Sequence, residues 1–389
     1  MLAGLAMLGP FSIDTYLPSF PAIQGRFSVT PLEMQQTLSV YLITFAVMSL
    51  FHGTLSDSFG RRPVILVSLA IFVVASIGCA AAQSFGQLLA FRSAQGFSAG
   101  VGWVVGRAVI RDSFQGFEAQ RLMSLVTMIF GLALALAPVI GGWLQGWLGW
   151  ESVFLFLALY GALLLVGCWL RLPETHPPAA RQPFALAPLA RNYLKLAGDV
   201  RLVLLCLAIA LNFCGFFLYI ASAPAFIYNL LGLTETDFVV LFVPGIAGVM
   251  LGAFVSGRAA GKLSPQRTVG VGYLVMFAAV AFNVGYHAFL PPALPWSVLP
   301  IMCYTIGMAL AMPSVTLIIL DLFPENRGLA SSLQGFTHSF FTAITAGLVS
   351  ALLSGLALTL ALGMAALLTL GWFSWMTYRY IETRSPAHE

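Results

Sequence analysis

Long stretches without charged residues alternate with short polar segments over almost the whole chain. About 20 apolar residues in a helix are enough to cross the hydrocarbon core of a membrane. Read in this way, the pattern predicts twelve membrane-spanning helices. They cover 1–23, 34–56, 63–91, 93–106, 122–150, 152–170, 202–234, 238–257, two helices in 268–320 divided near Pro291-Pro292, and two in 328–378 divided near Gly355. The hydrophobic residues form continuous runs, so the sequence predicts an all-α membrane protein and not a membrane β-barrel.

The composition agrees with this class. Of the 389 residues, 59% are hydrophobic and 8% are charged, whereas soluble domains have roughly 25% charged residues. A soluble protein of this length could not bury so much apolar surface. The net charge of +4 does not indicate nucleic-acid binding, because the positions of the basic residues follow the predicted membrane topology. No cofactor or metal is expected, since the five cysteines lie in apolar spans without paired spacing and are read as packing residues.

The basic residues lie mainly on one side of the predicted membrane. If the first helix starts in the cytoplasm, the loops on that side and the C-terminal tail contain all but two, Arg26 and Arg92, of the 18 Lys and Arg residues. This distribution satisfies the positive-inside rule and places both termini in the cytoplasm. No cleavable signal peptide is evident. The first apolar run starts at Met1, so we expect the natural protein to begin a few residues earlier.

A proline-containing segment separates two groups of six predicted helices. The expected division is an N-terminal bundle, a cytoplasmic connecting loop, and a C-terminal bundle with a short tail: 1–170, 171–201 and 202–389. A weak internal repeat supports two equivalent halves, because Pro18-Ser-Phe recurs as Pro224-Ala-Phe and the turn at Gly53 recurs at Gly257. Parallel repeats of this kind are common in secondary transporters.

One carboxylate lies inside the first apolar run. Even low estimates put the cost of an ionised Asp at the centre of a membrane helix at about 2.5–3.5 kcal/mol. Asp14 is therefore expected to be protonated, paired or facing water. Pro18 and Pro21 remove backbone donors just beyond it and loosen the helix, and Ile220 stands near the equivalent place in the second half. The sequence predicts that Asp14 is a proton-titratable carboxylate in a transport pathway.

A single arginine lies within the predicted hairpin of the third and fourth helices, at a depth similar to that of Asp14. Burial disfavours the charged form of a carboxylate, whereas a nearby arginine favours it. These opposing effects can place proton binding near the working pH, so Arg92 is predicted to act with Asp14 in proton coupling. The alternative is a static buried pair that only fixes helix packing.

The most specific motif lies between the second and third helices. It reads Gly53-Thr-Leu-Ser-Asp57-Ser-Phe-Gly60-Arg61-Arg62-Pro63. Glycines permit a tight cytoplasmic turn, and Asp57 can cap the next helix or pair with an arginine. Taken alone, the segment could also be an ordinary charged hairpin loop.

This loop resembles the signature of the major facilitator superfamily, and the twelve helices match the plan of that family. Asp14-Thr-Tyr-Leu-Pro18 together with 56–63 resembles the bicyclomycin- and chloramphenicol-resistance branch of drug/proton antiporters. Thr54 replaces the usual proline and Ser58 a usual basic residue, which weakens the charge cluster of the loop. The resemblance implies two pseudo-symmetric six-helix bundles, a link between Arg92 and proton coupling, and a loop that latches the halves in the outward-open state. The residues that it assigns to this latch are Gly53, Asp57, Gly60, Arg61, Arg62 and, near the end of the fourth helix, Asp112.

The predicted fifth helix contains a proline followed by paired glycines, which bends and thins a helix. The residues are Gly131, Pro138, Gly141 and Gly142. They resemble the motif that separates antiporters from uptake symporters in this superfamily, although Ala137 stands where a glycine is commoner. A packing kink without influence on the direction of transport is the alternative.

Other candidates rest on residue type alone. Polar, aromatic and adaptable side chains in helices expected to line a cavity are candidate substrate contacts, and each could equally be a packing residue: Tyr41, Asn212, Tyr219, Tyr304 and Met308. His338, with Gln334 one turn earlier, is a candidate second proton site or a hydrogen-bonded core histidine.

These observations predict a monomeric, proton-driven exporter of small lipophilic compounds such as phenicol-type or bicyclomycin-type antibiotics. Its partners would be the drug, protons and the lipid bilayer. The sequence contains no Gly-x-x-x-x-Gly-Lys-Ser/Thr loop for ATP and no nucleophile–base set that would indicate an enzyme. A proton-coupled uptake symporter for a small metabolite or peptide is the first alternative. A non-transporting membrane receptor or a membrane-bound transferase is the second.

Overall fold

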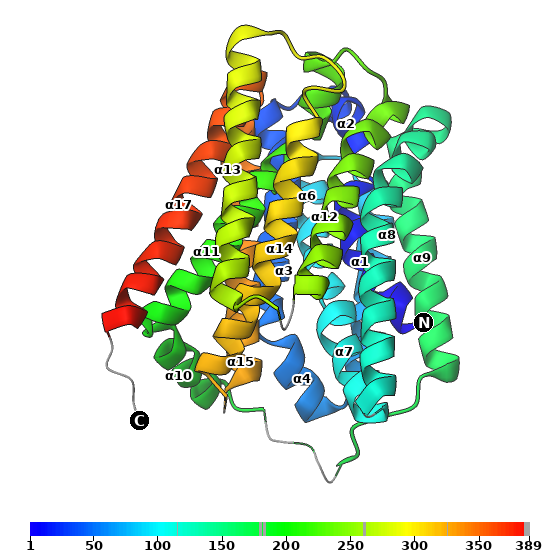
Figure 1. Cartoon of the computed structure of the whole chain (residues 1–389). Helices are drawn as coiled ribbons and strands as arrows, with labels where there is room; N and C mark the ends of the chain where they lie inside the picture. The colour runs from blue at the N-terminus through cyan, green and yellow to red at the C-terminus, as the bar shows by residue number, and fades with distance from the viewer. Residues whose placement is uncertain (115, 179–180, 182–183, 260–261, 325, 385–389) are drawn as a thin grey trace. The chain divides into compact units, whose positions relative to one another are not determined.

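The computed structural model describes residues 1–114, 116–178, 181, 184–259, 262–324 and 326–384, and within these ranges the chain is helical and without strands (Figure 1). The helices are α1 (Leu2–Asp14), α2 (Phe20–Phe27), α3 (Pro31–Ser49), α4 (His52–Phe59), α5 (Arg61–Ala80), α6 (Phe85–Ala99), α7 (Val101–Ser113), α8 (Gly116–Leu148), α9 (Trp150–Arg171), α10 (Leu186–Ala197), α11 (Val200–Ala221), α12 (Val239–Ala259), α13 (Pro265–Phe289), α14 (Leu299–Leu322), α15 (Arg327–Ile344), α16 (Ala351–Leu353) and α17 (Ala357–Arg384). The predicted all-α membrane fold is confirmed.

Nine continuous helical segments in the described ranges are long and apolar enough to cross a membrane, and α3 with α4 forms a tenth that is bent by 48°. The two remaining predicted spans coincide with interrupted helices. One is broken between α1 and α2 by a 3-10 turn at Leu17–Ser19, and the other between α6 and α7 at Gly100. Each of the twelve predicted spans therefore has a helical counterpart.

Three predicted boundaries are wrong for the same reason. The third and fourth spans were expected to divide at Arg92, but α5 ends at Ala80 and Arg92 lies inside α6, which starts at Phe85. The fourth span was expected to end at Gly106, but α7 continues to Ser113 and carries Arg107 and Arg111 within the helix. The segment 171–201 was expected to be a loop, but it contains the amphipathic helix α10. Charged residues marked the ends of the predicted spans, yet arginine and lysine are good helix formers and limit only the membrane-embedded part.

The chain forms two compact units. The first comprises 1–185 together with 233–239, and its main packing pairs are α5 with α9, α3 with α6, and α1 with α8. The second comprises 186–232 and the chain from 240 onward, in which α13 packs on α14 and α11 packs on α17 and α15. The repeated Pro-x-Phe segments both follow a helix end, since Pro18 comes after α1 and Pro224 after α11.

Candidate functional site

Asp14 is the last residue of α1 and is only 2% exposed. The hydroxyl groups on either side of it bond back to their own helix, from Ser12 to the Leu8 carbonyl (2.7 Å) and from Thr15 to the Phe11 carbonyl (2.5 Å). Among the described residues, none forms a hydrogen bond or an ion pair with the Asp14 carboxylate. The structure thus buries an acidic side chain that has no hydrogen-bond or ion-pair partner among the described residues.

Arg92 on α6 is completely buried beside the end of α1. Its Nη1 atom donates to the Ser12 carbonyl (3.0 Å) and to Gln95 Oε1 (2.7 Å), and its Nε atom lies 3.4 Å from the Thr37 carbonyl. The guanidinium carbon lies 4.3 Å from the ring centre of Tyr16 and 4.5 Å from that of Tyr41. Contacts of this kind are worth about 2 kcal/mol or more when desolvated. Arg92 therefore connects α1, α3 and α6.

The predicted pair of Asp14 and Arg92 does not form a direct ion pair in this structure. Arg92 uses its donors on backbone carbonyls and on Gln95, whose own Nε2 atom donates to Ser76 Oγ at 2.8 Å. Arg92 reaches the segment that carries Asp14 through the Ser12 carbonyl, two residues before it. Arg92 therefore contacts the backbone near Asp14, whereas the Asp14 carboxylate has no hydrogen-bond or ion-pair partner among the described residues.

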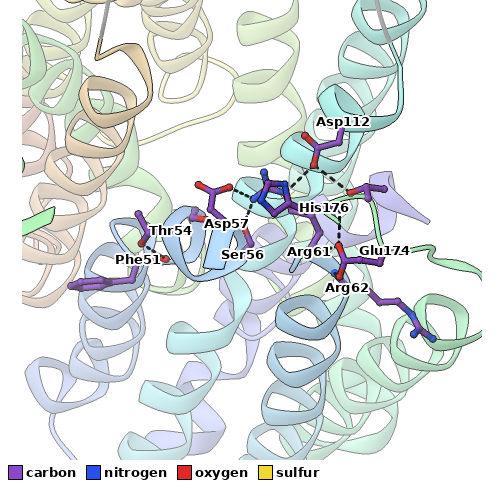
Figure 2. Close-up of polar contacts among 11 residues, drawn as sticks. Phe51, Thr54, Ser56, Asp57, Arg61, Arg62, Asp112, Glu174 and His176 are labelled. Atoms are coloured by element: carbon purple, nitrogen blue, oxygen red, sulfur yellow. Dashed lines mark hydrogen bonds and ion pairs between the residues drawn. The ribbon is translucent and has the colours of Figure 1, made fainter. Parts of the chain in front are cut away.

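Three of the predicted latch residues, Asp57, Arg61 and Asp112, meet at the junction of α4, α5 and α7 in the first unit (Figure 2). The Arg62 side chain instead donates to the Trp169 carbonyl on α9. The Arg61 side chain donates to the Asp57 carboxylate, to Ser56 Oγ (2.6 Å) and, through Nε, to Asp112 Oδ2 (3.0 Å). One guanidinium thus holds two carboxylates, which is the strong, charge-assisted class of hydrogen bond. Of the two roles considered for Asp57, a helix cap or a pair with an arginine, the structure shows the pair.

Glu174 completes this cluster, and sequence reasoning missed it. Its carboxylate accepts hydrogen bonds from the backbone amides of Arg61 (3.0 Å) and Arg62 (3.3 Å), which are the first residues of α5. A negative charge at a helix N-terminus satisfies free amides and interacts favourably with the helix dipole. Gly60 has a φ of 99°, and a Cβ atom there would collide with the Glu174 carboxylate. The glycine of the motif is therefore required both by its conformation and by this contact.

Replacing Glu174 with Ala should lower the free energy of unfolding by about 1–2 kcal/mol, because α5 loses its N-terminal cap and its dipole partner. Glu174→Gln should cost less, since one acceptor oxygen remains. The thermal unfolding midpoint of the purified protein measures both effects. An unchanged midpoint for Glu174→Ala would show that the cap contributes nothing.

The glycine motif of α8 lies against the segment that carries Asp14. A Cβ atom at Gly141 would collide with the carbonyl of Thr15, and one at Gly142 would collide with the carbonyl of Glu235 in the short turn 235–238 of the same unit. Gly131 has open space around it, and Pro138 lies inside α8, which continues to Leu148. Two of the predicted motif residues thus permit close backbone contacts, and Gly141 allows α8 to approach the residue next to Asp14.

Gly141→Ala should destabilise the protein by about 1–3 kcal/mol, because a side chain forced into a packed contact makes α8 move away from α1. Transport should fall with it if the position of the Asp14 turn matters. Gly131→Ala is the matched control on the same helix and should leave both properties unchanged. Unfolding midpoints and efflux rates of the two variants would be compared, and equal behaviour would contradict the expectation.

In the second unit, the predicted substrate contacts are tied to one another in the interior. Asn212 Nδ2 donates to the Tyr273 hydroxyl (2.9 Å), and the Tyr304 hydroxyl donates to the Asn212 carbonyl (2.7 Å). Asn283 donates to the Tyr219 hydroxyl (2.8 Å). These bonds connect helices, so they favour the packing alternative for Asn212, Tyr219 and Tyr304. Met308 is also buried. Tyr273 and Asn283 escaped sequence reasoning, although each is a polar residue in the apolar helix α13.

His338 lies on α15 with its ring centre 4.3 Å from that of Phe213. Gln334, one turn earlier, donates to Thr316 Oγ1 at 3.1 Å. The environment of His338 is thus aromatic on at least one face. Within the described residues, no group of His, Cys, Asp and Glu side chains could hold a metal ion.

The chain belongs to the Major Facilitator Superfamily, whose family model matches residues 2–346. This is a family of membrane transporters and not of enzymes. The Bicyclomycin resistance protein homolog of Haemophilus influenzae is 28% identical over 353 residues, which cover 89% of this chain and 87% of the relative. Multidrug resistance protein D of Escherichia coli (strain K12) is 27% identical over 351 residues, 90% and 87% of the two chains. The family predicted from the 53–63 loop is confirmed, and the names of these relatives agree with the resemblance of the Asp14 segment to the bicyclomycin-resistance branch.

Solved structures support the fold. A bacterial homolog of the human lysosomal transporter Spinster, in an inward-facing and unoccupied conformation, matches with a TM-score of 0.76 at 17% sequence identity. The match covers 99% of this chain and 97% of the other. The chain is therefore a multi-pass membrane protein with the major facilitator fold.

Proposed function

We propose that this protein exports small lipophilic compounds, such as phenicol-type or bicyclomycin-type antibiotics, in exchange for protons. It would work as a monomer in the bacterial inner membrane, with both termini in the cytoplasm. The names of the two relatives, a bicyclomycin resistance homolog and a multidrug resistance protein, support the class of substrate.

The observation that supports proton exchange best is the buried, unpartnered Asp14. A carboxylate taken out of water without a partner carries a large free-energy penalty when it is ionised. Binding of a proton removes the charge, and binding of a polar or cationic part of the substrate would compensate it. One side chain can thus accept either ligand, but both at once with difficulty, and such competition is what an antiporter requires.

In the proposed cycle, the two units alternate between states open to either side of the membrane. Substrate enters from the cytoplasm or from the inner leaflet and displaces a proton from Asp14. The transition to the outward-open state then releases the substrate outside. A proton from outside then resets the site. Each charge that moves down the membrane potential supplies about 2.3 kcal/mol per 100 mV. Arg92 would hold the end of α1 in place, Tyr41 beside it would contact substrate, and the Asp57–Arg61–Asp112 cluster would stabilise one of the two states.

Proton flux in vesicles tests this proposal against uptake by symport. In everted vesicles with an acidic lumen, an added substrate drug should alkalinise the lumen, because each drug molecule pumped in releases protons outward. An uptake symporter would instead alkalinise the external medium when solute is added to intact cells. A resistance screen with and without a protonophore identifies the drug to use. Resistance that survives the protonophore would contradict proton-driven export.

A further inference from the structure

Arg107 carries a positive charge inside α7. It lies one helical turn before Arg111, so two like charges share one side of the helix. Asp112, the acid next in sequence, is bound to Arg61. In the part of the chain that the structure describes, no carboxylate lies within ion-pair distance of Arg107 or Arg111.

The surroundings of Arg107 are apolar and aromatic. Its guanidinium carbon lies 3.5 Å from the ring centre of Trp103, and Trp103 in turn lies 4.7 Å from Phe130 on α8. Trp103, Ile110 and Phe114 belong to one hydrophobic cluster with residues of α1 and α8. These three residues are four before, three after and seven after Arg107, so they share its face of α7. Arg107 therefore lies on the face of α7 that packs against α1 and α8.

This arrangement leaves hydrogen-bond donors available. A guanidinium that stacks on an aromatic ring keeps its five N–H groups in its own plane, where they can bind a carboxylate, sulfonate or phosphate with two parallel bonds. An anionic ligand would supply the two positive charges of Arg107 and Arg111 with a counter-charge that no described carboxylate supplies. Trp103 and Phe130 place two partly exposed aromatic side chains beside the charge, and Met123 in the same cluster is an adaptable neighbour.

We propose that Arg107, with Arg111 and Trp103, binds the anionic group of an amphipathic molecule whose apolar or aromatic part packs on Trp103 and Phe130. The anion could belong to a transported compound or to the phosphate of an anionic phospholipid, and its chemistry is the same in both cases. As a statement about transported substrates the inference rests on the proposed export function. Binding itself can be measured without transport.

The test compares two probes that share one aromatic frame. The full-length protein in phosphatidylcholine nanodiscs is titrated with 8-anilinonaphthalene-1-sulfonate, which is anionic, and with N-phenyl-1-naphthylamine, which is neutral. Arg107→Gln should weaken sulfonate binding about tenfold or more, since hydrogen bonds to charged groups contribute about 1.5–3 kcal/mol. Binding of the neutral probe should stay within about twofold, because the aromatic surface remains. Arg258→Gln is the matched control and should change neither titration. Arg258 follows Phe254 by four residues, as Arg107 follows Trp103, and its guanidinium carbon lies 4.3 Å from the Phe254 ring centre in the second unit.

Several outcomes would overturn the proposal. These are sulfonate binding by Arg107→Gln at wild-type strength, an equal loss for both probes, or an equal loss in Arg258→Gln. If Arg107→Gln does not fold, two single variants, Arg107→Lys and Arg111→Gln, are compared in its place. Arg107→Lys should retain sulfonate binding more strongly than Arg111→Gln retains it, and equal wild-type binding by both would also overturn the proposal.

Adding phosphatidylglycerol to the nanodiscs distinguishes the two sources of the anion. Competition with the sulfonate in the wild type identifies a lipid site, and its absence identifies a site for soluble compounds; both results support an anion site. Asp14→Asn should leave sulfonate binding intact even where it stops export, so failure of the export mechanism and failure of this site give different results.

Discussion

Asp14→Asn should reduce drug efflux to background while the protein remains folded. Asparagine has nearly the shape of aspartate but cannot exchange a proton, so the competition between proton and substrate is lost. Stability should hold or rise, because the change removes a buried carboxylate that no described residue compensates. Efflux from cells expressing the variant and the thermal unfolding midpoint of the purified protein are the two measurements.

The matched control for this variant is Asp237→Asn. Asp237 lies in the same unit, but its carboxylate accepts hydrogen bonds from the backbone and side chain of Thr234 at an exposed turn. This control should keep full efflux and lose at most about 1 kcal/mol of stability through a weaker cap. Wild-type efflux by Asp14→Asn would remove the proton-coupling role and would leave the fold and the family unaffected.

Much of the fold could be predicted because membrane thickness fixes helix length. The divisions near Pro291-Pro292 and Gly355 match the ends of α13 and α16. An uncharged run about twice as long as the membrane is thick must contain two membrane-spanning helices, so a division near its middle was expected. The helix breaks were harder to predict. No proline marks the interruption between α3 and α4, or the one between α6 and α7 at Gly100.

The candidate site was predictable where its contacts are local. Asp57 and Arg61 are four residues apart, and neighbours at that spacing on a helix commonly pair. Glu174 binds the backbone of Arg61 across 113 residues of sequence, so nothing in its own segment distinguishes it from any other surface acid. The partners of Arg92 were equally hidden, because backbone carbonyls and aromatic faces occur everywhere along such a chain. A sequence indicates which charged residues lie in apolar segments, but not which backbone carbonyls and aromatic rings they contact.

Arg92 variants should separate a structural role from a coupling role. Arg92→Lys keeps the charge but cannot reproduce the planar fork between Tyr16 and Tyr41. We expect it to lower the free energy of unfolding by about 2–4 kcal/mol, because stacking and charge-assisted hydrogen bonds are lost together in a buried place. Arg26→Lys, at the exposed end of α2 and 6.0 Å from the Phe27 ring centre, should cost almost nothing.

Arg92→Gln then tests the charge itself. The glutamine can still donate to the Ser12 carbonyl or to Gln95, but the positive charge near Asp14 is gone. If this charge helps to set when Asp14 releases its proton, the pH dependence of efflux should move in Arg92→Gln and stay in place in Arg92→Lys. If both variants lose stability and keep the wild-type pH profile, Arg92 only holds α1, α3 and α6 together. Because Arg92 forms no direct ion pair with Asp14, neither substitution removes a direct partner from the Asp14 side chain, and the two variants differ in the charge at this position.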